Sequence, residues 1–149
     1  MQPRPRPAAL LLRWGKMNVS VKEAPDSPVI FESNKLSWIE FRNELGRLVT
    51  LVIFMPGGEA FLVSNIDDPD FVTTAHNFNI KLQIEPGQNI LLYEKALLSP
   101  YSSTSATWLE FKDNSDCLAA VFIFVPGENP QIYNRNDPQF LGLISGFNL

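Results

Sequence analysis

The amino-acid sequence predicts a mostly antiparallel β domain, a sandwich or a flattened barrel, built from two tandem repeats with one short helix in each. Three observations support this fold class. The chain contains one 20-residue pattern twice. Several stretches alternate apolar and polar residues with the period of two that is typical of strands, and turn-forming Pro-Gly, Asn and Asp residues separate them. We expect about ten to twelve strands and a pseudo-two-fold relation between the repeats.

The repeated pattern reads WIEFRNELGRLVTLVIFMPG at Trp38–Gly57 and WLEFKDNSDCLAAVFIFVPG at Trp108–Gly127, with eight of twenty positions identical. Weaker matches upstream and downstream extend it, so we assign residues 17–85 to repeat one and residues 86–149 to repeat two. Each repeat of roughly 65–70 residues would be marginally stable alone. We therefore expect the two repeats to share one core within a single domain.

Residues 1–16, MQPRPRPAALLLRWGK, do not resemble the repeat. They contain four basic residues and no acidic one, and the Pro-Arg alternation favours an extended, unpacked chain. The segment is either a weak match to a targeting peptide or a non-native leader before Met17. In both cases we expect it to be disordered and to lie outside the fold.

The rest of the chain is acidic. Removing those four basic residues from the total of twelve leaves eight basic against sixteen acidic residues, a net charge of −8. Because an acidic body repels phosphate, we expect no nucleic-acid partner. No apolar run approaches the roughly 18–20 residues of a membrane span, so we expect no membrane partner and a cytoplasmic, soluble protein.

The chain has one cysteine and one histidine. Cys117 cannot form an intrachain disulfide, and we expect a buried structural thiol at the start of an apolar strand. His76 is expected at the surface near a helix end. No metal site and no cofactor are predicted.

Two long strands carry the repeated pattern. At Leu36–Arg42, alternation places Leu36, Trp38, Glu40 and Arg42 on one face and Ile39 with Phe41 on the other. Leu48–Met55 is almost continuously apolar, which indicates a strand buried on both faces. Val121–Val125 is expected to form the corresponding strand of repeat two, also buried on both faces. Shorter strands are predicted at Met17–Glu23, Val29–Phe31, Ala60–Val63, Asn89–Lys95 and Gln131–Tyr133.

Asp68-Pro69 and Asp137-Pro138 predict helix starts, with the aspartates as caps and the prolines in the first turn. The acids at 67, 68 and 70 also suggest calcium, but the EF-hand spacing and its glycine are missing, and capping explains Asp68 without a metal. After the first helix, Phe78–Ile84 alternates apolar and polar residues and predicts an amphipathic strand.

An aromatic, an acidic and a basic side chain share one strand face in each repeat, which suggests a site for a sugar or another polar ring. The alternative is a half-buried tryptophan beside a solvated ion pair. A further interpretation is that the two glutamates pair across a pseudo-two-fold axis for acid–base chemistry. The candidate residues are Trp38, Glu40 and Arg42 in repeat one and Trp108, Glu110 and Lys112 in repeat two.

The leading function hypothesis is a non-catalytic binding or assembly module, because no nucleophile–base pair, metal cluster or cofactor loop is recognisable. The alternative is a small-ligand protein, carbohydrate being one such ligand, or an enzyme with a site between the repeats. That site would use Trp38, Glu40, Trp108 and Glu110. Replacement of both glutamates by glutamine separates these hypotheses.

We also expect a homo-oligomer, most simply a dimer. Repeat two ends at Leu149, three residues into the strand that repeat one runs to Ile84. A truncated strand would leave backbone donors and acceptors open at a sheet edge, and a second copy could pair with them.

Overall fold

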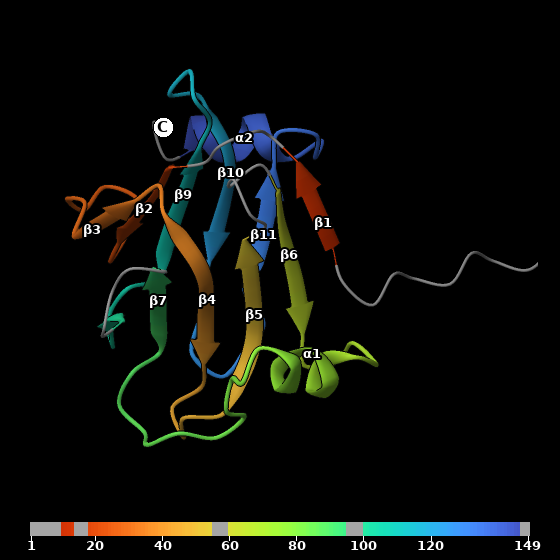
Figure 1. Cartoon of the computed structure of the whole chain (residues 1–149). Helices are drawn as coiled ribbons and strands as arrows, with labels where there is room; N and C mark the ends of the chain where they lie inside the picture. Colours follow the sequence, from red (N-terminus) through yellow and green to blue (C-terminus); the bar gives the residue numbers. More distant parts are fainter. Residues whose placement is uncertain (1–9, 14–17, 55–59, 95–99, 147–149) are drawn as a thin grey trace, which may run out of the picture.

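The computed structural model describes residues 10–13, 18–54, 60–94 and 100–146, which form a two-layer β-sandwich (Figure 1). The described residues contain eleven strands and two short helices. Every pairing between neighbouring strands is antiparallel. This confirms the predicted sandwich and the short helix in each half of the chain.

The first sheet has six strands in the order β1-β6-β5-β4-β7-β8. Its bounds are β1 Leu10–Arg13, β4 Leu36–Arg42, β5 Leu48–Phe54, β6 Ala60–Asn65, β7 Ile90–Glu94 and β8 Tyr101–Ser103. The second sheet has five strands in the order β11-β10-β9-β2-β3. Its bounds are β2 Asn18–Lys22, β3 Phe31–Ser33, β9 Trp108–Lys112, β10 Leu118–Ile123 and β11 Gln131–Asn134.

Each sheet combines strands from both halves of the chain. In the first sheet β4, β5 and β6 are joined by β7 and β8 of the second half, and in the second sheet β9, β10 and β11 are joined by β2 and β3 of the first half. The two orders correspond strand for strand once β1 is set aside. This is the order that an internal duplication with exchanged opening strands would give; pseudo-two-fold symmetry itself stays a prediction.

The central core fills the space between the two sheets with side chains from alternate strand positions. Phe41 and Phe61 from the first sheet meet Phe111 and Phe122 from the second, with ring centroids 5.2 Å apart for Phe61–Phe111 and 6.1 Å for Phe41–Phe122. All four side chains are fully buried. Large aromatic side chains of this kind contribute most of the buried apolar area of a core.

A second cluster lies on the outer face of the first sheet, beneath helix α1 (Phe71–Asn77). Phe71 and Ala75 of α1 pack against Leu48, Leu51 and Ile53 of β5. Strand β5 is therefore covered by the central core on one face and by α1 on the other. This confirms the prediction, made from its continuous apolar run, of a strand buried on both faces.

Strand β4 departs from strict alternation at its start. Its pairing with β7 shifts register between Leu36 and Trp38, and Leu36 packs into the central core with Ile39 and Phe41. The prediction that Leu36 shares a face with Trp38 is wrong, because a bulge adds a residue and turns the side chain to the other face.

The predicted amphipathic strand at Phe78–Ile84 is also wrong. The last turn of α1 accepts hydrogen bonds from the first backbone amides of this segment. Phe78 N and Ile80 N donate to Ala75 O at 3.2 and 2.9 Å. Downstream, one isolated bridge between Arg47 and Gln83 is the only ladder pairing among the described residues of this segment. Because residues 78–84 do not form this strand, no truncated counterpart is expected at the C-terminus; residues 147–149 lie outside the described residues.

Part of the leader belongs to the fold. Leu10–Arg13 form β1, which pairs with β6 at the edge of the first sheet, so these four residues differ from the expectation that residues 1–16 lie outside it. Strand β5 pairs with one side of β6, and the backbone amides and carbonyls of β1 pair with the other side. The remainder of 1–16 lies outside the described residues.

Candidate functional site

Trp38, Glu40 and Arg42 form one cluster on the outer face of the first sheet. Their neighbours Ile39 and Phe41 point the other way, into the central core. Trp38 Nε1 donates to Glu40 Oε2 at 2.8 Å, while Arg42 Nε and Nη2 donate to Glu40 Oε1 at 2.8 and 2.6 Å. The structure thus brings together three predicted site residues, but both oxygens of Glu40 are already engaged by the other two.

The Arg42 guanidinium also forms hydrogen bonds with backbone carbonyls of the protein. Nη1 donates to Gly46 O at 3.0 Å and to Leu82 O at 3.4 Å, and Nη2 donates to Lys81 O at 2.7 Å. With the two bonds to Glu40, these contacts account for the five N–H groups of an arginine. Only 1% of its side chain is exposed, so Arg42 fastens the 81–82 segment to the β4–β5 turn.

The Trp38 ring also has protein neighbours. It stacks on Tyr93 of β7 with ring centroids 4.2 Å apart, and it packs against the cluster beneath α1. Burial, and next the negative charge of Glu40, raise the pKa of Tyr93 to about 12. Because Tyr93 occupies a face of the indole, the geometry gives no support to sugar stacking at this position.

The corresponding residues of the second sheet are arranged differently. Trp108 Nε1 donates to Glu110 Oε2 at 2.8 Å, as in the first cluster. The cation, however, is Lys22 of the neighbouring strand β2, whose Nζ lies 2.8 Å from Glu110 Oε2. Lys112 instead lies 3.9 Å from Asp116. The prediction that Lys112 joins Trp108 and Glu110 is therefore wrong, because a cation on the adjacent strand is already in contact with Glu110.

Glu40 and Glu110 do not face each other. Their neighbours along the chain, Phe41 and Phe111, both point into the space between the sheets. Side chains alternate along a strand, so the two glutamates lie on opposite outer faces of the sandwich. The structure does not bring them together as a carboxylate pair, and it does not form a shared site between the repeats from the two Trp-Glu pairs.

The Asp-Pro motifs precede both helices, but Asp68 is not the N-cap residue of α1 as predicted. Asp68 Oδ2 accepts from Asn65 N at 2.7 Å and Asp137 Oδ2 accepts from Asn134 N at 2.8 Å, so each closes the turn after a strand. The N-cap residue of α1 is Asp70, without a side-chain cap bond. Within the described residues, no group of three or more His, Cys, Asp or Glu side chains is placed to hold a metal ion.

Cys117 is exposed, which contradicts the expected buried thiol. It belongs to the β9–β10 turn, where its amide donates to Asp113 Oδ1 at 3.1 Å, and the buried part of the following strand begins after it. His76 is exposed in the last turn of α1, as expected.

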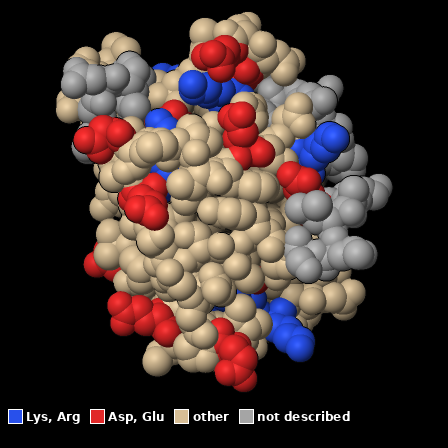
Figure 2. All heavy atoms as spheres, turned by 90° about the vertical axis from the view of Figure 1, so that its left-hand side faces the viewer, with Lys and Arg blue, Asp and Glu red and all other residues tan. Residues whose placement is uncertain are grey.

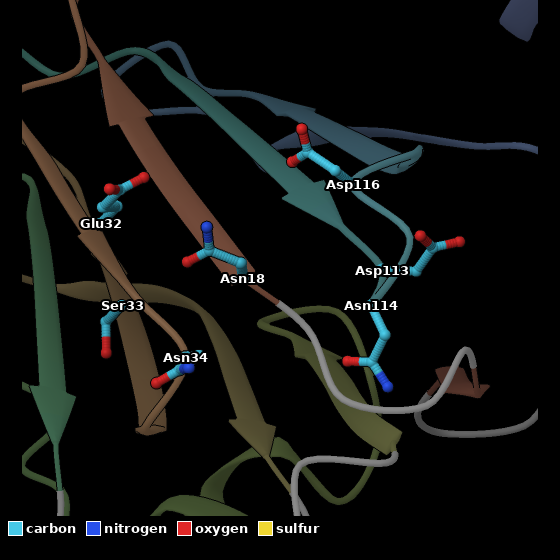
Figure 3. A pocket seen from close by; sticks show the side chains of 7 residues that line it. All are labelled: Asn18, Glu32, Ser33, Asn34, Asp113, Asn114 and Asp116. Carbon is cyan, nitrogen blue, oxygen red and sulfur yellow. The ribbon is translucent and has the colours of Figure 1, made fainter.

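A polar hollow of about 470 Å³ lies at one end of the second sheet (Figure 3). It is formed by the start of β2, the end of β3 and the β9–β10 turn. Its lining residues are Asn18, Glu32, Ser33, Asn34, Asp113, Asn114 and Asp116. The only sequence signal for this hollow is a set of Asn and Asp residues near strand ends, and one sequence does not reveal which strand ends meet.

The lining residues differ in how many hydrogen bonds and ion pairs their side chains form with the rest of the protein. Asp113 accepts from Arg135 Nη2 at 2.8 Å and from the amides of Ser115 and Cys117. The bond from Arg135, followed by that from Cys117 N, holds the pKa of Asp113 below its usual value. By contrast, four side chains make no hydrogen bond or ion pair with another described residue: Asn18, Glu32, Asn34 and Asn114.

The hollow adjoins a side of the sandwich where both sheets end. Strands β3 and β8 are the last strands of their sheets on this side, and Phe31 stacks on Tyr101 with centroids 4.4 Å apart. Figure 2 shows this side with an uncharged middle and mainly acidic side chains around it. Val29 and Ile30, which lead into β3, are 46% and 40% exposed. We call this surface the open side.

No family model, no curated protein and no solved structure matches the chain. Neither helix among the described residues is long and apolar enough to cross a membrane.

Proposed function

We propose that this chain is a non-catalytic binding or assembly module whose interaction surface is the open side formed by β3 and β8. The single observation that carries the proposal is that the strongest candidates for chemistry are used internally. Glu40, Arg42 and Glu110 each bind other side chains of the same domain. The Trp-Glu motifs therefore stabilise the outer faces of the two sheets.

This arrangement weakens the alternative of a small-ligand protein or enzyme with a site between the repeats. General acid–base catalysis needs a carboxyl group within reach of a substrate proton. Glu40 and Glu110 are 3% and 4% exposed and lie on opposite faces. The alternative keeps no geometric support from the four residues on which it was based.

The open side favours assembly because it combines exposed apolar residues with two edge strands that lack a second neighbour among the described strands. Edge strands offer unpaired backbone groups to another chain. The uncharged middle of this face (Figure 2) would cost little desolvation on contact. A second copy of the chain is the simplest partner, since closed two-fold dimers are the commonest oligomers. A cytoplasmic location remains part of the proposal.

Sedimentation equilibrium of the full chain at micromolar protein and physiological salt tests the assembly function. We expect a species of about twice the 16.8 kDa chain mass. Ser102→Lys, on edge strand β8, should shift the population towards the monomer, because lysine on an edge strand disfavours pairing. Thr73→Lys, on the exposed face of α1, is the matched control and should change nothing. A single species near the chain mass at every concentration would remove the assembly function.

A further inference from the structure

We infer that the open edge of β3 binds an extended segment of a partner protein that carries Lys or Arg at alternate positions, one basic side chain entering the polar hollow. This inference rests on the proposed binding function and gives it a partner chemistry. It uses the β3 edge together with the hollow of Figure 3, whereas the assembly test concerns β8.

The first step is the backbone. Strand β3 ends the second sheet and pairs with β2 alone among the described strands. Its residues Phe31, Glu32 and Ser33 thus have one side that no described strand covers. An extended peptide can extend such a sheet, and its main-chain hydrogen bonds then supply affinity independent of its sequence.

The second step is the direction of the side chains. Glu32 lies opposite Ser20 of β2, and Ser20 lies opposite Glu110 of β9, so the three share the outer face of the second sheet. A strand added beside β3 would place every second side chain on this face. A peptide side chain next to Glu32 would share a face with this carboxylate, which lines the hollow. The residues at alternate peptide positions therefore decide which peptide fits.

The third step is charge. The Glu32 carboxylate and the amides of Asn18, Asn34 and Asn114 are not bonded to other described residues, and Asp116 is 84% exposed with its nearest cation, Lys112 Nζ, 3.9 Å away. Three carboxylates line the hollow. Arg135 is bonded to only one of them, Asp113. Carboxylate and amide oxygens accept hydrogen bonds from a guanidinium or an ammonium group, and an acidic peptide would meet repulsion.

The test uses two synthetic nine-residue peptides, one alternating arginine with threonine and one alternating glutamate with threonine. Each is titrated into the full chain labelled with ¹⁵N, and amide shifts are followed by NMR. We expect the arginine peptide to bind, with the largest shifts at Asn18 and Phe31–Asn34, and the glutamate peptide not to bind. Equal binding of the two peptides, or binding of neither, would overturn the inference.

Variants locate the contact. Glu32→Lys and, separately, Asn114→Lys should weaken arginine-peptide binding by about tenfold, the effect of losing one charge-assisted hydrogen bond. Glu44→Lys makes the same charge change at an exposed position of the β4–β5 turn and should alter affinity less than about twofold. Equal weakening by Glu44→Lys would show attraction to the whole acidic body and overturn the local site.

A peptide N-methylated at alternate residues tests the edge pairing, because it lacks the amide donors that a new strand needs. We expect it to bind at least about tenfold more weakly, since several backbone bonds are lost. Undiminished binding would overturn pairing with β3. If the arginine peptide fails while the Ser102→Lys variant still dissociates a dimer, this inference is wrong and the assembly function stands.

Discussion

The two Trp-x-Glu clusters begin from the same motif and recruit their cations from different strands. In the first sheet Trp38 lies opposite Tyr93, an uncharged residue that stacks on it. The cation that pairs with Glu40 is therefore Arg42 of the same strand. In the second sheet Trp108 lies opposite Lys22, which forms an ion pair with Glu110. The residue on the adjacent strand therefore decides whether the motif's own basic residue is buried or left at the surface.

Each sheet contains strands from both halves of the chain, and dividing the chain into its two halves is the strongest test of this arrangement. A fragment of residues 17–85 would lack β7, which flanks β4, and β9, which flanks β2. We expect no cooperative thermal transition from this fragment, because both of its sheets would lose a central neighbour and its core would be too small. Circular dichroism during heating is the measurement.

Co-expression of residues 17–85 with residues 86–149 is the control for that experiment. The two fragments together should recover the fold, since every strand is then present. A sigmoidal transition from 17–85 alone, with dispersed amide signals, would contradict the exchanged arrangement.

Removal of the Arg42 side chain should have the next largest effect. Arg42→Ala leaves Glu40 buried without its cation and removes the bonds to Gly46, Lys81 and Leu82. Breaking a buried ion pair by removing one partner costs about 3–5 kcal/mol of unfolding free energy. Urea denaturation followed by tryptophan fluorescence measures the loss.

Lys112→Ala sharpens the comparison because it removes the corresponding basic residue of the second repeat. Lys112 is 33% exposed and 3.9 Å from its partner, so its removal should cost about 0–1 kcal/mol. Equal losses for Arg42→Ala and Lys112→Ala would refute the different roles assigned to the two residues.

The sequence predicted the sandwich, both helices and the shared face of Trp38, Glu40 and Arg42, because these depend on local periodicity. It failed at Phe78–Ile84 for a non-local reason. Alternation there suits a strand, but the carbonyls of Lys81 and Leu82 are taken by Arg42 and by the Leu48 amide. That Lys22, and not Lys112, pairs with Glu110 depends on which strands are neighbours. The position of the polar hollow depends on the same neighbours, and one sequence does not specify them.

The β4–β5 and β9–β10 turns offer a smaller contrast. Gly46 has φ +82°, and a Cβ there would lie 2.2 Å from Ile84 O. Gly46→Ala should therefore cost about 1–3 kcal/mol, because the left-handed conformation is strained for alanine and the Ile84 segment must move. Asp116 holds the matching position with φ 62°. Asp116→Gly should change stability by no more than about 0.5 kcal/mol in the same urea assay.

A pH dependence of stability should belong to the first cluster alone, since Lys22 stands opposite Trp108 where Tyr93 stands opposite Trp38. Burial and the charge of Glu40 raise the pKa of Tyr93 from 10.0 to about 12. A group whose pKa is higher in the folded state contributes stability that is complete below its unfolded pKa and is lost as the pH rises through its folded pKa. Stability should therefore fall between pH 10 and about 12. Tyr93→Phe should remove this part of the decline in urea midpoints measured across that range, together with the highest-pH step of the phenolate absorbance titration. If the wild-type chain and Tyr93→Phe lose stability in parallel, the phenol is not held neutral by its surroundings, and the contrast between the two clusters reduces to the choice of cation.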